Sequence, residues 1–262
     1  MDNKKLIAGF GYQEGRISSW DGKRTYTQAV PQMAKHCCDN GVDEILVYDW
    51  SVTDEDHEAA IAVIKEVCRE ADAPVIAGGR VKRMEDVKKY LYAGASAVFL
   101  DMSKEENTDM IKEASGRFGK EKIYAYLPTD EYIDSVKDYG AAGASVMLLN
   151  TAGSVPSLLE MASISDSEAS FLFFLQAKDD AKDTAESLKN AFGCGNICGA
   201  VLTFTEDNMD SSMTIKQSLK AAAISVDTFE SSVDWKDFKL NSDGLIPVIV
   251  QRSEERRVGK EC

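Results

Sequence analysis

The sequence has few of the residues that build metal centres or disulfide frameworks. It contains two histidines and six cysteines in 262 residues, and the cysteines are too few and too irregularly spaced for a disulfide-stapled fold. We therefore interpret them as reduced thiols. Cys194 and Cys198 form the pair whose spacing is closest to that of metal ligands, but His36 and His57 lie far from them in the sequence, so no metal site is predicted.

Long apolar runs and an excess of positive charge are also missing. No stretch approaches the roughly 20 apolar residues that a spanning helix needs, and only a short apolar run follows residues 1–5, which argues against a signal peptide. We therefore expect a cytoplasmic protein. Thirty Lys and Arg residues against 44 Asp and Glu residues give a formal net charge of −14. Such a field repels phosphate backbones and anionic lipids, so neither nucleic acid nor membrane is an expected partner.

What the sequence does contain is a regular alternation of short apolar strands and amphipathic helices. The alternation is clearest over residues 41–101, where apolar runs at 44–48, 75–77 and 97–100 are separated by two helical patterns. Eight such units fit into residues 1–224, and their strands are apolar on successive residues, as in strands covered on both faces. The pattern predicts an α/β fold with a closed (β/α)8 barrel, and an open parallel sheet is the alternative.

In a barrel of this kind the chemistry lies in the loops that follow the strands. Asp49 and Asp101 are the carboxylates that directly follow predicted strands. They are weak catalytic candidates, because two carboxylates across a barrel mouth can act as acid and base if burial separates their pKa values. The alternative is that each carboxylate caps a helix or bonds its own loop. Gly78, Gly79 and Arg80 are candidates for phosphate binding, although a tight turn would need the same glycines.

Three stretches carry a family resemblance: KKLIAGFGYQEGRI, GVDEILVYDW and APVIAGGRVKRMEDVKKYLYAGASAVFLD. They resemble the cyclase subunit of imidazole glycerol phosphate synthase and its sister isomerase of histidine biosynthesis, which are phosphate-binding (β/α)8 barrels. The resemblance is clear over residues 4–101 and continues mainly as spacing. It implies a barrel fold and a phosphorylated ribonucleotide as the ligand. Asp49 is the acidic strand-end position that the resemblance retains.

The same resemblance shows that two catalytic positions differ. In those enzymes the first strand ends in an acid–base aspartate, and in the register set by Gly15 and Arg16 that position is Gly11. A second catalytic aspartate, at the end of the fifth strand, corresponds to Leu127. Because neither side chain can transfer a proton, we expect a non-catalytic barrel that serves as a scaffold or ligand-binding module. The alternative is an active histidine-pathway enzyme, of the cyclase or isomerase type, that acts on a phosphorylated metabolite.

The phosphate-binding positions of the resemblance differ as well. Three glycines are expected after the third strand, where this chain has Gly78, Gly79 and Arg80. An Asn-Thr pair is expected after the fourth strand, where this chain has Asp101 and Met102. The resemblance therefore implies a partial phosphate site at most.

The end of the chain carries a second resemblance. After a polar linker at 225–232, residues 238–251 (FKLNSDGLIPVIVQ) resemble the opening of phosphoribosyl-AMP cyclohydrolase. We expect residues 233–251 to be the truncated start of that hydrolase domain in a fusion with phosphoribosyl-ATP pyrophosphatase. The zinc, the magnesium and any homo-oligomer contacts would belong to the missing part, and no cofactor is expected in this fragment. Residues 252–262 (RSEERRVGKEC) resemble a translated sequencing adapter and are interpreted as an artefact.

Overall fold

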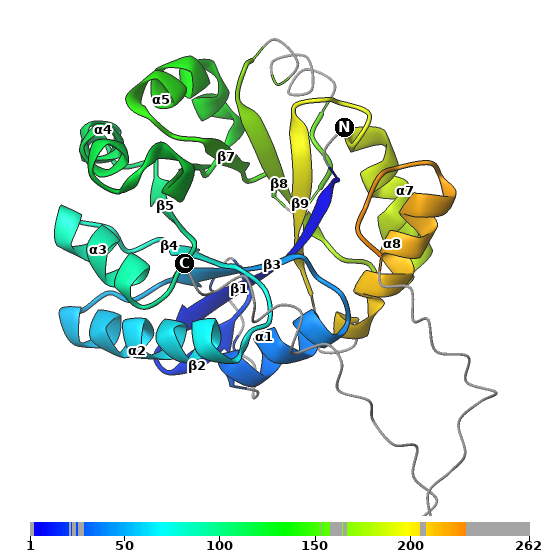
Figure 1. Cartoon of the computed structure of the whole chain (residues 1–262), viewed down its shortest axis with the longest axis horizontal. Coiled ribbons are helices and arrows are strands. Elements are labelled where there is room, and N and C mark those ends of the chain that lie inside the picture. The colour runs from blue at the N-terminus through cyan, green and yellow to red at the C-terminus, as the bar shows by residue number, and fades with distance from the viewer. Residues whose placement is uncertain are drawn as a thin grey trace, which may run out of the picture. The chain divides into compact units, whose positions relative to one another are not determined.

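Parallel strands close into a barrel surrounded by helices in this computed structural model (Figure 1). The structure describes residues 3–20, 22, 25, 29–152, 154–157, 164, 167–204 and 208–228. The chain divides into the units Met1–Asp227 and Thr228–Cys262, and the elements below all belong to the first. The cyclohydrolase-like stretch at 238–251 and the tail at 252–262 lie outside the described residues.

The strands recur at fairly regular intervals along the chain. Their bounds are β1 Lys5–Gln13, β2 Arg16–Ser18, β3 Glu44–Asp49, β4 Val75–Gly78, β5 Ala97–Asp101, β6 Ile123–Leu127, β7 Val146–Leu149, β8 Ser170–Gln176 and β9 Ile197–Thr203. All neighbours pair in parallel except β2, which pairs antiparallel with β1. β9 also pairs with β1, from Lys5 opposite Gly199 to Ala8 opposite Leu202. This pairing closes eight parallel strands into the predicted (β/α)8 barrel, and the open-sheet alternative is wrong.

Helices connect the strands on the outside of the barrel. The α-helices are α1 Val30–Asp39, α2 Asp54–Glu70, α3 Met84–Tyr92, α4 Glu106–Phe118, α5 Val136–Ala142, α7 Ala181–Ala191 and α8 Ser212–Ala221, and the 3-10 turns are η1 Lys120–Lys122, η2 Asp130–Ser135 and η3 Met209–Ser211. Helix α2 shows why such segments start where they do. The Thr53 side chain caps its first turn by accepting a hydrogen bond from the Asp56 amide, and acidic residues in that turn complement the helix dipole.

The strands separate the core into two layers. Side chains on one face of each strand pack inside the barrel, and those on the other face pack against the helices. In β3, Leu46 and Tyr48 belong to the inner layer, while Ile45 and Val47 belong to the outer one. Because side chains alternate along a strand, this assignment fixes which strand-end residues face the barrel mouth.

One strand lies outside the predicted strand–helix units. Arg16–Ser18 form the short strand β2, which folds back on β1. The segment that follows carries Trp20 into the inner layer, where its side chain is 8% exposed. The chain therefore places a residue of its first connection inside its own barrel.

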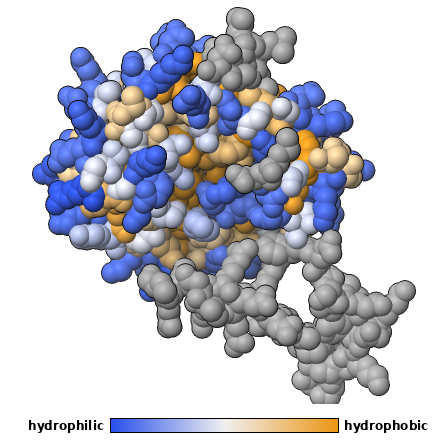
Figure 2. All heavy atoms as spheres, turned by 45° about the horizontal axis from the view of Figure 1, so that its top comes forward, coloured by the Kyte–Doolittle hydropathy of each residue, from blue (hydrophilic) through white to orange (hydrophobic). Residues whose placement is uncertain are grey.

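The surface is polar over most of its area. In the view of Figure 2, hydrophilic residues form much of the outline, and hydrophobic residues gather toward the middle. Val52 and Tyr92 are the large hydrophobic residues that stand exposed among those described. No helix in the described part of the chain combines the length and the apolar character needed to cross a membrane.

Candidate functional site

The barrel mouth, at the carboxyl ends of the strands, is filled by aromatic side chains of the chain itself. The centroid of the Trp20 ring lies 4.2 Å from that of Phe174, with the planes 33° apart. Tyr48 and Tyr126 meet the indole edge to face, at centroid distances of 5.1 and 5.9 Å, and Phe99 lies 6.3 Å away. A packed aromatic cluster therefore stands where a ligand of a barrel enzyme would enter.

The polar atoms of the cluster are joined by hydrogen bonds. Trp20 Nε1 donates to the Tyr126 hydroxyl at 3.3 Å, and Asn150 Nδ2 donates to the same oxygen at 3.0 Å. The Tyr48 hydroxyl donates to Asp101 Oδ2 at 3.3 Å. Burial raises the pKa of Tyr126 to about 12, and burial together with the Asp101 charge raises the pKa of Tyr48 further. Both hydroxyls are therefore neutral near pH 7 and cannot act there as bases.

The inner face of β1 carries no side chain at the level of the cluster. A Cβ added at Gly9 would lie 2.6 Å from Val201 Cγ1, with Trp20 behind it. A Cβ added at Gly11 would overlap Ser18 Oγ and lie 2.7 Å from the Ser19 carbonyl oxygen. Position 11, which corresponds to the acid–base aspartate in the family resemblance, is thus a glycine, and Ser18 and Ser19 pack directly against it.

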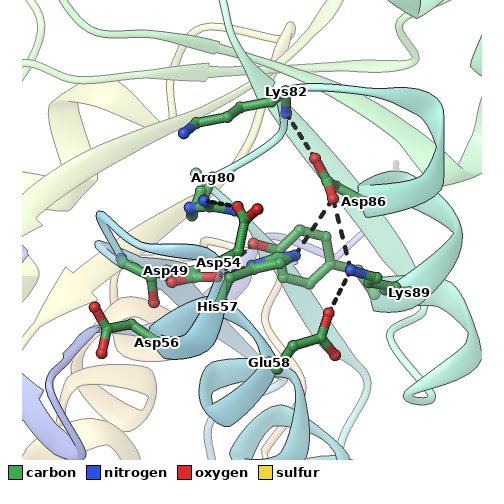
Figure 3. A network of polar contacts seen from close by, with 12 residues as sticks. Asp49, Asp54, Asp56, His57, Glu58, Arg80, Lys82, Asp86 and Lys89 are labelled. Atoms are coloured by element: carbon green, nitrogen blue, oxygen red, sulfur yellow. Dashed lines mark hydrogen bonds and ion pairs between the residues drawn. The ribbon is translucent and has the colours of Figure 1, made fainter.

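Because Tyr48 faces the inside of the barrel, Asp49 points into the layer between the barrel and its helices. Figure 3 shows it beside His57. Its Oδ2 lies 2.7 Å from His57 Nδ1 on α2 and accepts a hydrogen bond from the Tyr90 hydroxyl on α3 at 2.8 Å. Its Oδ1 accepts from the Ser51 amide at 2.9 Å. With a side chain that is fully buried, Asp49 ties the end of β3 to two helices. The bond to the Ser51 amide matches the alternative that this carboxylate bonds its own loop.

The network continues from His57 to Asp86, one of two acidic residues in the first turn of α3. His57 Nε2 faces Asp86 Oδ1 at 3.6 Å, which is an ion-pair distance but too long for a hydrogen bond. Asp86 Oδ2 accepts from the backbone amides of Lys82 and Arg83 at 3.0 and 3.1 Å. The sequence signal for this network is helical spacing, because His57 falls on the same face of α2 as Ala60 and Asp86 falls on the same face of α3 as Tyr90.

Asp101 lies on the opposite side of the sheet from Asp49. It follows Ala97 and Phe99 on the inner face of β5, and its Oδ1 accepts from the Ser103 amide at 2.9 Å. The residue is 8% exposed. The structure therefore does not bring the two candidate carboxylates into one pocket, and among the two only Asp101 faces the mouth.

Gly78 and Gly79 fit closely under aromatic rings. A Cβ at Gly78 would lie 2.8 Å from Phe99 Cγ, and one at Gly79 would lie 2.5 Å from Tyr48 Cε1. Gly79 also has a φ of +103°, which L side chains rarely adopt. Lys104 Nζ donates to its carbonyl oxygen at 3.2 Å. Packing and backbone geometry thus account for the glycine pair.

Arg80 is buried and engaged in bonds within the fold. It donates to Asp54 Oδ1 at 2.5 Å and to the Val52 carbonyl oxygen at 3.5 Å. The guanidinium group holds the pKa of the exposed Asp54 carboxyl below its usual range, mainly through this hydrogen bond. Figure 3 shows Arg80 pointing toward Asp54 at the start of α2. A phosphate at Gly78 and Gly79 would have to compete with Asp54 for it.

Leu127 ends β6 but faces the helices rather than the mouth. It is fully buried in the outer layer, and the last inward side chain of that strand is Tyr126. On the inner face, the side chain nearest the end of β6 is thus Tyr126, whose hydroxyl accepts a hydrogen bond from Trp20.

The described residues offer no metal centre. They contain no group of three or more His, Cys, Asp or Glu side chains that could hold an ion. Cys198 Sγ donates to the Phe171 carbonyl oxygen at 3.1 Å, and His36 pairs with Asp210.

Comparison with known proteins adds two observations. The family described as "Histidine biosynthesis protein" matches residues 14–156. The imidazole glycerol phosphate synthase subunit HisF of Staphylococcus aureus strain Newman is 29% identical over 137 residues, which are 51% of this chain and 53% of the relative. The same protein from strain MRSA252 gives the same values. The match thus spans about half the length of these curated relatives.

Proposed function

Because the chain belongs to the histidine biosynthesis protein family, we propose that it serves that pathway as a non-catalytic barrel. In this role it is a scaffold or ligand-binding module that keeps the family's frame without its acid–base reaction. The observation that carries the proposal is the state of position 11. It holds a glycine, and the space that a side chain would need is taken by Ser18 and Ser19.

The remaining candidate residues support the same proposal. Asp49, the acidic position retained in the family resemblance, is bonded to His57 and Tyr90 in the outer layer. Asp101 faces the mouth without a second carboxylate among the candidates, whereas a paired acid–base mechanism needs two groups with different pKa values. The aromatic cluster fills the inner layer on the side that Asp101 faces.

The test is an assay of the purified full chain with the phosphorylated ribonucleotide intermediates of histidine biosynthesis. We expect no turnover above the rate without protein, and no growth when the gene is supplied to a histidine auxotroph that lacks the cyclase subunit. Turnover that scales with protein concentration, or complementation of the auxotroph, would overturn the proposal.

A second candidate function is catalysis on a phosphorylated metabolite. The similarity to HisF favours it, together with the inward carboxylate of Asp101. If this candidate is right, Asp101→Asn lowers kcat at least 100-fold, because it removes the proton-transfer group at the mouth. Asp49→Asn is the matched comparison, since that carboxylate lies in the outer layer and its loss lowers stability rather than kcat. Equal kcat values for the wild type and Asp101→Asn would refute this candidate.

A fusion to a phosphoribosyl-AMP cyclohydrolase is a further proposal that rests on sequence alone. Its basis is the motif at residues 238–251, which lies outside the described residues. The decisive observation is the uninterrupted gene downstream of the codon for Gln251. A following reading frame with the aspartates and cysteines of a metal-binding hydrolase would support the fusion, and any other continuation would refute it.

A further inference from the structure

We propose that His57 is a charged clamp between helices α2 and α3, and that loss of its second ring proton releases the connection between β4 and α3. The clamp is the chain of contacts Asp49–His57–Asp86. It joins the last residue of β3 to the first turns of α2 and α3. Because these contacts lie in the outer layer, the clamp is independent of whether the barrel is catalytic.

Both nitrogens of the His57 ring face carboxylate oxygens. Nδ1 lies 2.7 Å from Asp49 Oδ2, and Nε2 lies 3.6 Å from Asp86 Oδ1. The three side chains are each at most 1% exposed, so bulk water has little access to either contact. An ionised carboxylate only accepts hydrogen bonds, and a ring nitrogen donates one only when it carries a proton. The number of ring protons therefore decides whether each contact attracts or repels.

Neither neutral tautomer of the imidazole suits these surroundings. With the proton on Nδ1, the bond to Asp49 is kept, but the lone pair of Nε2 faces the Asp86 oxygen. With the proton on Nε2, two acceptors stand 2.7 Å apart at Asp49. Within the described part of the chain, His57 Nε2 and Asp86 Oδ1 have no hydrogen-bond partner, and buried acceptors of this kind are costly. A ring with both protons makes both contacts attractive.

The cations near Asp86 do not replace the ring proton. Arg83 Nε and Lys89 Nζ lie 3.8 and 3.9 Å from Asp86 Oδ1, which is beyond hydrogen-bond distance. Lys89 is also paired with Glu58 on α2 at 2.5 Å. The Arg83 side chain is 63% exposed, so solvent screens its charge. The buried oxygen therefore depends on His57 for a charge on its own side of the helix.

The groups around Asp49 leave the same role to His57. Burial, and after it the Asp49 charge, raises the pKa of Tyr90 on α3, and the same two causes raise the pKa of Tyr12 on β1. Both phenols are therefore neutral near pH 7. Arg80 is engaged at the start of α2. A buried carboxylate needs a paired charge, and His57 is the group in direct contact that can supply it.

Asp86 transmits the clamp to the connection between β4 and α3. Its Oδ2 accepts hydrogen bonds from the backbone amides of Lys82 and Arg83, while its Oδ1 faces His57. Figure 3 shows Asp86 in contact with Lys82, His57 and Lys89. When the ring loses a proton, the Nε2 lone pair repels the carboxylate, which turns away by giving up the two amides. The connection is therefore ordered when His57 is charged and opens locally when it is neutral.

The first test counts the ring protons of His57 in the full chain. The sequence contains two histidines, His36 and His57, so ¹H–¹⁵N NMR spectra of the imidazole rings contain few signals, and His36→Gln assigns those that remain. We expect both ring nitrogens of His57 to be protonated at about pH 7. A His57 Nε2 without a proton at this pH would overturn the inference.

The second test follows hydrogen exchange at the Lys82 and Arg83 amides while the pH is raised through the titration of His57. The rates are expressed relative to those of an unstructured chain at the same pH, which removes the intrinsic pH dependence. We expect the protection of both amides to fall about tenfold as His57 becomes neutral, while the amides of β7 keep theirs. Constant protection of the two amides would overturn the inference, and so would a His57 that keeps both protons until the barrel unfolds.

Two histidine variants complete the comparison. His57→Gln has no titrating ring at this position, so the protection of the amides at 82 and 83 should be low and independent of pH. His36→Gln is the matched control, because His36 lies on α1, pairs with Asp210 and is 48% exposed. This control should keep the pH dependence of the wild type, and its loss in His36→Gln with retention in His57→Gln would refute the inference. If His57→Gln does not fold, the spectra and exchange rates of the wild type decide.

Discussion

The hydrogen bond between Tyr90 and Asp49 offers a direct measure of what the outer-layer network contributes to stability. The hydroxyl and the carboxylate oxygen are 2.8 Å apart, and both side chains are fully buried. Tyr90→Phe removes this bond with almost no change in shape, and His57 and Ser51 still bond the carboxylate. A hydrogen bond to a charged group contributes roughly 1.5–3 kcal/mol, so we expect the free energy of unfolding to fall by about 2 kcal/mol.

The measurement is urea-induced unfolding, supported by thermal unfolding. For a barrel of this size a loss of about 2 kcal/mol corresponds to a Tm lower by roughly 4–8 °C. Tyr92→Phe is the matched control, because Tyr92 lies on the same helix and is 73% exposed. A surface change of this kind is expected to stay within about 0.5 kcal/mol.

Equal effects of Tyr90→Phe and Tyr92→Phe would refute the reasoning, since the bond would then contribute nothing beyond what water supplies. An unchanged midpoint with a changed m-value would point instead to an altered unfolded state.

Three other changes have defined outcomes. Lys216→Met leaves the Asp43 carboxylate without the buried ammonium group that bonds it at 2.5 Å. We expect the free energy of unfolding, measured in urea, to fall by about 3 kcal/mol, and the double variant Lys216→Met/Asp43→Asn to recover part of this loss. Burial raises the pKa of Tyr126 to about 12, which is above the value near 10 of an unfolded tyrosine. The contribution of Tyr126 to the free energy of unfolding is therefore complete below pH ~10 and is lost as the pH rises toward ~12. Tyr126→Phe should reduce this loss. Gly11→Asp forces Ser18 aside and should cost roughly 1–3 kcal/mol without creating cyclase activity, and a gain of turnover would contradict the argument.

The barrel could be predicted from the sequence because its signal is repetitive. Apolar runs and helical stripes recur eight times, so an error at one element does not change the fold. The direction of each strand-end side chain could not be predicted, because strands buried on both faces are apolar at every position. Asp49 and Asp101 therefore look equivalent in the sequence, although they face opposite sides of the sheet.

The burial of Trp20 inside the barrel could not be predicted for a different reason. It follows a three-residue strand without periodicity, and nothing local to it predicts burial in a barrel. The usable signal lay in β1, where Gly9 and Gly11 leave the inner face of the strand without side chains. Because protein interiors are close-packed, that space has to be filled from elsewhere, and a large aromatic residue in the next connection is a suitable candidate.

The position of Asp49 bears on what the family similarity means. An acidic residue at the end of a barrel strand suggests chemistry, yet here it bonds His57, Tyr90 and Ser51 and holds the strand to two helices. The retained residue is therefore explained by folding alone. Similarity to a relative at an outer-layer position of this kind reports on the fold of the barrel and not on proton transfer. The residues that separate an enzyme from a non-catalytic barrel are those that face the mouth, which makes Gly11, Trp20 and Asp101 the positions where experiments discriminate.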